Sequence, residues 1–157
     1  LLPLRYQNHE YIETGELPGM LRSDNWNKRV TALRAARKRG LDITLFPSHT
    51  RMLESPHIAE RYWVARALSV SRSPRAYEEL LFLLNDPNFN VTYSAIYALG
   101  KRGDKKAIPI ILRWIKTSDN WYVQEYAYRS LRRLGWNQNR ELGDAGLVFA
   151  VNNLIFK

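Results

Sequence analysis

The stretch from Asn90 to Leu112, NVTYSAIYALGKRGDKKAIPIIL, decides the fold. Its apolar residues recur at spacings of three and four as far as Leu99, and the same spacing resumes at Ala107. This period is typical of amphipathic helices. Gly103 lies at the break, where a glycine supplies the left-handed conformation that ends a helix. The stretch therefore predicts two helices joined by a glycine turn.

The same pattern recurs in four copies along the chain. The tetrapeptide from Ser23 to Trp26 returns at Ser118 to Trp121, and successive shifts of 32, 31 and 32 residues bring two intermediate copies into register. Four columns align: Trp26, Ile58, Phe89 and Trp121; Ala32, Val64, Ala95 and Ala127; Ala35, Ala67, Ala98 and Ser130; Ala36, Leu68, Leu99 and Leu131. Each copy is thus predicted to contain an amphipathic first helix with a seam of small core residues. Trp121 is assigned to the core with the other members of its column.

A second helix is predicted in the middle copies, because the apolar positions around Leu80 match those around Ile111 at a shift of 31. Gly40, Gly103 and Gly135 share one column and are predicted to end the first helices. Asp86 and Asp119 precede first helices, where a short acceptor side chain is expected to cap the exposed amides.

These residues resemble a HEAT repeat. The match rests on Ala95-Ile96-Tyr97-Ala98-Leu99-Gly100, on Gly103-Asp104 and on Pro109 early in the second helix, and it looks most like the short subtype named after phycobilisome lyases. The resemblance implies an all-α, right-handed α-solenoid, a superhelix of about four helical hairpins. We expect an N-terminal extension or cap at 1–22, repeats at about 23–54, 55–85, 86–117 and 118–136, and a C-terminal helix at 137–157 that caps or completes the last repeat.

Composition narrows the function classes. The 157 residues carry 24 Lys and Arg against 15 Asp and Glu, a net charge of +9 that favours acidic partners. No cysteine is present, which excludes disulfides and thiolate metal sites, and the three histidines have no metal-ligand spacing. The uncharged stretch from Ala145 to Phe156 is too short to span a bilayer. Because the chain begins with Leu1, we expect it to be a piece of a longer protein, whose compartment the sequence leaves undetermined.

The candidate binding residues come from the polar side of the first helices. At about 100° per residue, Tyr97 and Lys101 point away from the apolar seam, so their columns are predicted to form the outer surface. Second helices are expected to line the concave face, where the charges are mixed. The predicted binding residues are Arg34, Arg66, Tyr97, Lys101, Arg129 and Arg133, with Arg37 and Arg132 in neighbouring columns. Either they form a solvated cation–π ladder, or they bind phosphates or an acidic partner.

No catalytic constellation is visible, because the chain lacks a carboxylate pair on one helix face and every familiar nucleotide or nucleophile motif. No cofactor and no metal are expected. The sequence therefore favours a non-enzymatic interaction or scaffold domain of a larger protein that binds an acidic protein partner. The alternative is a basic nucleic-acid-binding module, including a relative of the HEAT-like DNA glycosylases, and an anionic membrane surface is a third possible partner.

Overall fold

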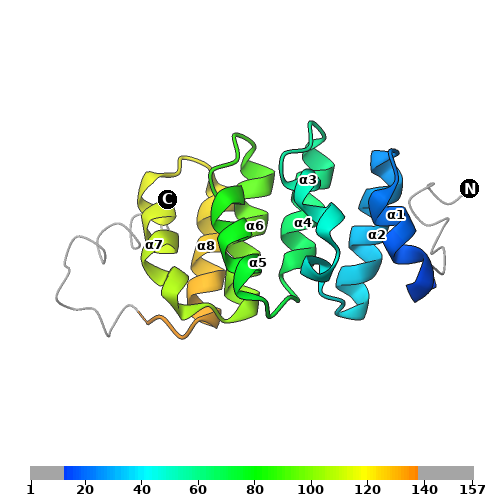
Figure 1. Ribbon diagram of the computed structural model, residues 1–157. Helices are drawn as coiled ribbons and strands as arrows, with labels where there is room; N and C mark the ends of the chain where they lie inside the picture. The colour runs from blue at the N-terminus through cyan, green and yellow to red at the C-terminus, as the bar shows by residue number, and fades with distance from the viewer. Residues whose placement is uncertain (1–12, 138–157) are drawn as a thin grey trace, which may run out of the picture.

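The computed structural model describes residues 13–137, and within that range all regular structure is helical. Eight α-helices lie in this range, with short 3-10 turns between some of them (Figure 1). The helices are α1 (Leu17–Arg22), α2 (Trp26–Arg39), α3 (Thr50–Leu53), α4 (Ile58–Leu68), α5 (Pro74–Leu83), α6 (Phe89–Arg102), α7 (Ile108–Thr117) and α8 (Trp121–Arg133). The predicted all-α architecture is confirmed.

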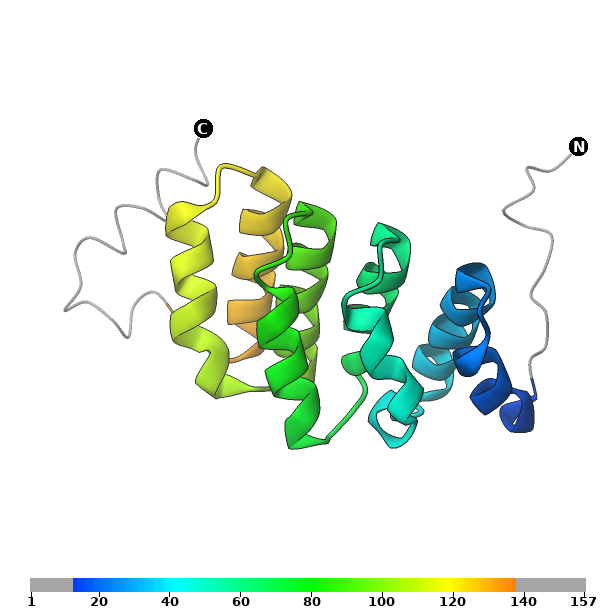
Figure 2. The same cartoon turned by 45° about the horizontal axis from the view of Figure 1, so that its top comes forward.

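The helices form two layers that run along the array. One layer consists of α2, α4, α6 and α8, which pack directly on one another in chain order. In the other layer α1, α3, α5 and α7 each pack on the helix that follows them, which produces the four side-by-side pairs of Figure 2. Neighbouring members of this second layer have little or no contact with one another. Because one layer is closely packed and the other is spread apart, the array bends toward α2, α4, α6 and α8, which we call the inner layer.

The observed pairing begins half a repeat earlier than the sequence periodicity suggests. The sequence shows no period before Met20, yet Leu17 and Leu21 of α1 are fully buried against α2. Each predicted second helix packs mainly on the first helix of the next copy, as α7 does on α8. In copy one the second helix is reduced to two 3-10 turns, Ile43–Leu45 and Pro47–His49, followed by α3. The proposed C-terminal helix lies outside the described residues, apart from Asn137.

The small-residue seam forms the core as predicted. The columns that contain Ala95 and Leu99 are fully buried in all four copies, and only Ala35 is half-buried in the column of Ala98. The prediction that the column of Trp26, Ile58, Phe89 and Trp121 belongs to the core is wrong. Trp121 is 61% exposed and Phe89 is 43% exposed, because each is the first residue of its helix and lies at the edge of the layer.

The glycine caps are confirmed and the aspartate caps are not. Gly40 and Gly103 end α2 and α6 with φ angles of 69° and 78°. Three of the four first helices, α2, α6 and α8, start instead from asparagine N-caps: the side chains of Asn25, Asn88 and Asn120 accept hydrogen bonds from backbone N–H groups two residues later. Asparagine does so because its side-chain oxygen has the same short reach as that of aspartate. The fourth, α4, starts from His57 without a side-chain cap. Asp86 accepts from the Asn88 N–H one step earlier in the turn, and Asp119 is exposed.

Candidate binding surface

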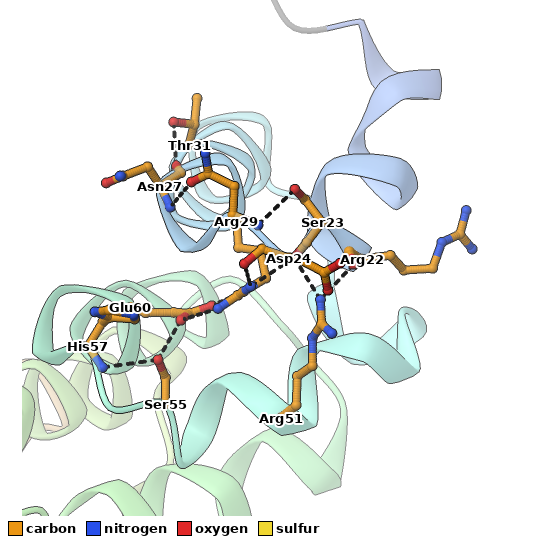
Figure 3. Close-up of polar contacts among 11 residues, drawn as sticks. Arg22, Ser23, Asp24, Asn27, Arg29, Thr31, Arg51, Ser55, His57 and Glu60 are labelled. Carbon is orange, nitrogen blue, oxygen red and sulfur yellow. Dashed lines mark hydrogen bonds and ion pairs between the residues drawn. The ribbon is translucent and has the colours of Figure 1, made fainter.

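Three arginines of the array hold the repeats together. Arg29 donates to the backbone carbonyl of Ser23, six residues earlier, and to the carboxylate of Glu60 in the next repeat (Figure 3). Arg61 repeats the arrangement, with Ser55 O at 2.6 Å and Asp86 as its carboxylate partner. These side chains are largely buried, and their charges are compensated within the protein.

The third arginine, Arg102, joins the end of α6 to the turn before α5. It pairs with Asp104 at 2.6 Å and donates to the carbonyls of Ser71 and Ser73. Its guanidinium is therefore also compensated, and it has a structural role like that of Arg29 and Arg61.

A second group of cations lacks carboxylate partners. It consists of Arg34, Arg37, Arg66, Lys101 and Arg133, which lie on the four helices of the inner layer. None of them forms an ion pair with any residue that the structure describes. Arg129, predicted with this group, differs because it pairs with Glu125 one helical turn earlier at 2.6 Å.

Four cations act on Tyr97, and we call this group the Tyr97 cluster: Arg37, Arg66, Lys101 and Arg133 with Tyr97 itself. The Arg66 guanidinium carbon lies 3.9 Å from the centre of the Tyr97 ring, and that of Arg133 lies 5.0 Å away. Arg37 Nη2 lies 3.5 Å from the Tyr97 hydroxyl as a hydrogen-bond donor. The contacts join α2, α4, α6 and α8 through a single phenol ring.

The neighbouring positive charges lower the pKa of the Tyr97 hydroxyl. Burial acts to raise the pKa of its hydroxyl, but the hydrogen bond from Arg37 and the positive charges of Arg66 and Lys101 outweigh it, so this pKa lies below its ordinary value. The direction indicates a positive local potential at the hydroxyl. For Tyr93, one turn earlier on α6, burial dominates and the pKa is raised.

Aromatic rings continue the inner layer toward the N-terminal ends of its helices. Tyr93 stacks on Tyr126 with ring centres 4.6 Å apart, and Tyr62 meets Tyr93 edge to face at 6.1 Å. Trp121 stacks on Tyr122 at 3.8 Å and remains exposed. The inner layer thus carries cations at the C-terminal ends of its helices and aromatic rings at the N-terminal ends.

The structure differs from the prediction that these columns form an outer surface. Arg37 of α2 reaches Tyr97 of α6 past the intervening helix α4, a contact between residues 60 positions apart. Such a contact requires that side chains converge, as they do on the side toward which the array bends. The layer of α5 and α7, predicted to be concave, is the spread one. The reason is that the true helical pairs are offset from the sequence repeat by one helix.

The predicted binding residues are only partly brought together. Arg66, Tyr97, Lys101 and Arg133 meet in the Tyr97 cluster. Arg34 stands apart on the face of Trp63, with its guanidinium carbon 5.2 Å from the ring centre. Arg37 was only a neighbouring-column residue in the sequence, and nothing in the chain's local pattern could show that it contacts α6.

A hollow of about 430 Å³ lies elsewhere, between the turn that joins α3 to α4 and the turn that joins α5 to α6. Its wall includes Phe82, which is 51% exposed, and the ion pair of Arg61 with Asp86. Because that pair is already satisfied within the protein, and the other charged residue of the wall, Glu54, is a carboxylate, the hollow offers no free cation to an acidic ligand. The Tyr97 cluster is the better candidate.

The profile of one protein family matches this architecture. HEAT repeats match residues 47–132, which is more than half of the chain. The chain belongs to the HEAT-repeat family. HEAT repeats generally bind proteins and typically have no catalytic role, so the domain is an interaction scaffold in its general class. The comparison with curated proteins gives no match.

The described part of this HEAT domain contains neither a candidate membrane span nor a candidate metal site. In residues 13–137 no helix is both long and apolar enough to cross a membrane. The same residues contain no group of three or more potential metal ligands placed to hold an ion.

Proposed function

We propose that this HEAT domain is an interaction module of a larger protein and binds an acidic segment of a protein partner on its inner layer. The observation that carries the proposal is the Tyr97 cluster, where four cations from four helices gather without a carboxylate among the described residues. Uncompensated like charges repel one another, and an anionic ligand relieves this repulsion. Binding of such a ligand is therefore electrostatically favourable.

The neighbouring cations extend the same surface along the array. Arg34 and Arg129 are exposed on either side of the cluster, and Arg129 shares its charge with Glu125. The binding surface therefore comprises Arg34, Arg66, Tyr97, Lys101, Arg129 and Arg133, with Arg37 added by the structure. The repeat boundaries near 54, 85 and 117, and the short phycobilisome-lyase-like subtype, remain our interpretation of the sequence pattern, and the subtype does not imply chromophore chemistry.

A nucleic-acid ligand is the second candidate, because Phe89 and Trp121 expose aromatic surface at the N-terminal ends of two helices that carry the cations. Most rings of the inner layer, however, are engaged with one another. Tyr93 and Tyr126 stack together, and Tyr97 holds Arg66. Few faces are left for bases, so the acidic peptide is favoured.

The test compares charge reversals on the two layers. Lys101→Glu with Arg133→Glu alters the inner layer, while Arg113→Glu with Lys116→Glu makes the same change in charge on α7, and all four residues are exposed. Binding of a labelled polyglutamate peptide and of a single-stranded oligonucleotide is measured at two salt concentrations. We expect the inner-layer variant to lose most peptide affinity and the α7 variant to keep it.

Two outcomes would contradict the proposal. One is equal loss of peptide affinity in both variants, which would show that only net charge matters. The other is tighter binding of the oligonucleotide than of the peptide, with a steep salt dependence that flattens in the inner-layer variant, which would favour the nucleic-acid alternative.

A further inference from the structure

Two hydrogen-bond donors in the Tyr97 cluster are buried without an acceptor. They are the Nε–H groups of Arg37 and Arg66, for which the described residues offer no partner. A buried donor that has lost water and gained no acceptor is costly, and native proteins contain few of them. The cluster is therefore short of negative charge and also of acceptor oxygens.

The geometry leaves other donors of the cluster available. A guanidinium that lies on an aromatic face, as Arg66 does on Tyr97, keeps its N–H groups in the plane of the fork. The Tyr97 ring thus orients Arg66 without using up its donors, and Arg133 lies on the same ring. Forked donors of this kind match the oxygen spacing of carboxylates and phosphates.

The amount of charge distinguishes these two ligands. A carboxylate brings one negative charge and two oxygens. A phosphorylated side chain brings a charge of about −1.5 to −2 and three strong acceptor oxygens. Four cations around one ring exceed what a single carboxylate can compensate.

We infer that the four cations of the Tyr97 cluster form an oxyanion site that binds the phosphate of a phosphorylated side chain in the protein partner. The inference rests on the proposed function and deepens it, because the inner layer then recognises a phosphorylated residue of the partner as well as its acidic residues. The flanking Arg34 and Arg129 contact acidic residues on either side of the phosphate. A peptide is the source of the phosphate because the rings around the cluster are packed together and unavailable to bases.

The experiment uses the full chain and three fluorescein-labelled pools of degenerate nonapeptides, with phosphoserine, glutamate or serine at the central position. Binding is measured by fluorescence polarisation at about 0.15 M salt, where exposed long-range attraction is largely screened. We expect the phosphoserine pool to bind about tenfold more tightly than the glutamate pool, since several charge-assisted hydrogen bonds distinguish them.

Variants assign the effect to the cluster. Arg66→Gln should lower affinity for the phosphoserine pool about tenfold and change affinity for the glutamate pool by less than about twofold. Because Arg66 is half-buried, Arg133→Gln at an exposed position provides the same test with less risk to folding. Tyr97→Phe keeps the ring and should retain most of the preference, whereas Tyr97→Leu should lose it. Arg113→Gln on α7 is the matched control and should change nothing.

The failures can be told apart. Equal affinity for the phosphoserine and glutamate pools, with both weakened alike by Arg133→Gln, overturns the phosphate site and leaves the acidic-partner function standing. Inorganic phosphate that binds as tightly as the phosphoserine pool overturns the peptide as its source. If no pool binds while a single-stranded RNA does so in an Arg133-dependent way, both the site and the proposed function are wrong.

Discussion

Gly100 shows how closely two neighbouring inner-layer helices approach. A Cβ atom added at this position would lie 2.5 Å from the Cβ and 2.8 Å from the Cα of Ser130 on α8. The Ser130 hydroxyl uses the same close approach to donate to the Ile96 carbonyl at 3.0 Å. Small residues in the seam therefore let α6 and α8 pack backbone to backbone.

We expect Gly100→Ala to destabilise the protein by about 1–3 kcal/mol, because the backbone of α8 must shift to relieve the overlap. Gly19→Ala is the matched control, since Gly19 lies in α1 with nothing near its Cβ position and should gain about 0.5–1 kcal/mol from reduced unfolded-state entropy. Urea unfolding of both variants measures the difference. A gain in stability at both glycines would show that α6 and α8 lie farther apart.

At the scale of the elements, α2 and α4 are joined by a buried ion pair. Glu60 is fully buried, and its carboxylate accepts from Arg29 and from the Ser55 hydroxyl. Desolvation of both ions offsets most of their attraction, so the intact pair contributes little net stability. Removal of only one partner is costly, because it leaves a lone buried charge.

Glu60→Leu should therefore destabilise the protein by about 3–5 kcal/mol, whereas Arg29→Met with Glu60→Leu should recover most of the loss. Glu125→Ala, which breaks the exposed pair with Arg129, should cost less than about 1 kcal/mol. Denaturant melts of these three variants and of Arg29→Met alone test this. Additive losses in the double variant would mean that Arg29 and Glu60 act independently.

The turn after α2 contains Asp42, whose carboxylate makes the stability of the protein depend on pH. Burial acts to raise the pKa of Asp42, but hydrogen bonds from Ser71 and Thr44, together with the charge of Arg102, hold this pKa below its ordinary value. A carboxyl whose folded pKa is depressed contributes stability above its unfolded pKa, and this contribution is lost as the pH falls through the folded pKa.

We therefore expect part of the unfolding free energy to disappear as the pH drops below about 4. Asp42→Asn should be less stable at neutral pH and should show a flatter decline in acid. The free energy of unfolding, measured from about pH 6 to about pH 3, gives the comparison. Parallel curves for the two proteins would exclude Asp42 as a contributor.

At the scale of the whole molecule, the two layers account for the secondary structure of most of the chain. Circular dichroism should show a mainly helical protein with little strand, because the paired helices occupy most of residues 17–133. A strand-rich spectrum would contradict the HEAT architecture.

The sequence by itself determined α2 and the helices from α4 to α8, the repeat and the buried seam. These depend on spacings of three and four residues and on glycines that end helices, and such local rules are readable in the chain, as the buried columns of Ala95 and of Leu99 show. It also singled out Arg66, Tyr97, Lys101 and Arg133 by their shared register.

Only the tertiary structure decided which helices pair and which layer is the inner one. A strict repeat looks the same wherever its unit is taken to begin, so the periodicity could not show that α1 pairs with α2 or that α7 pairs with α8. The contact of Arg37 with Tyr97 depends on the bend of the array, which arises from the close packing of one layer and the wide spacing of the other. That difference in spacing belongs to the packed molecule, because it is set by how whole helices fit together and not by the pattern within any one of them.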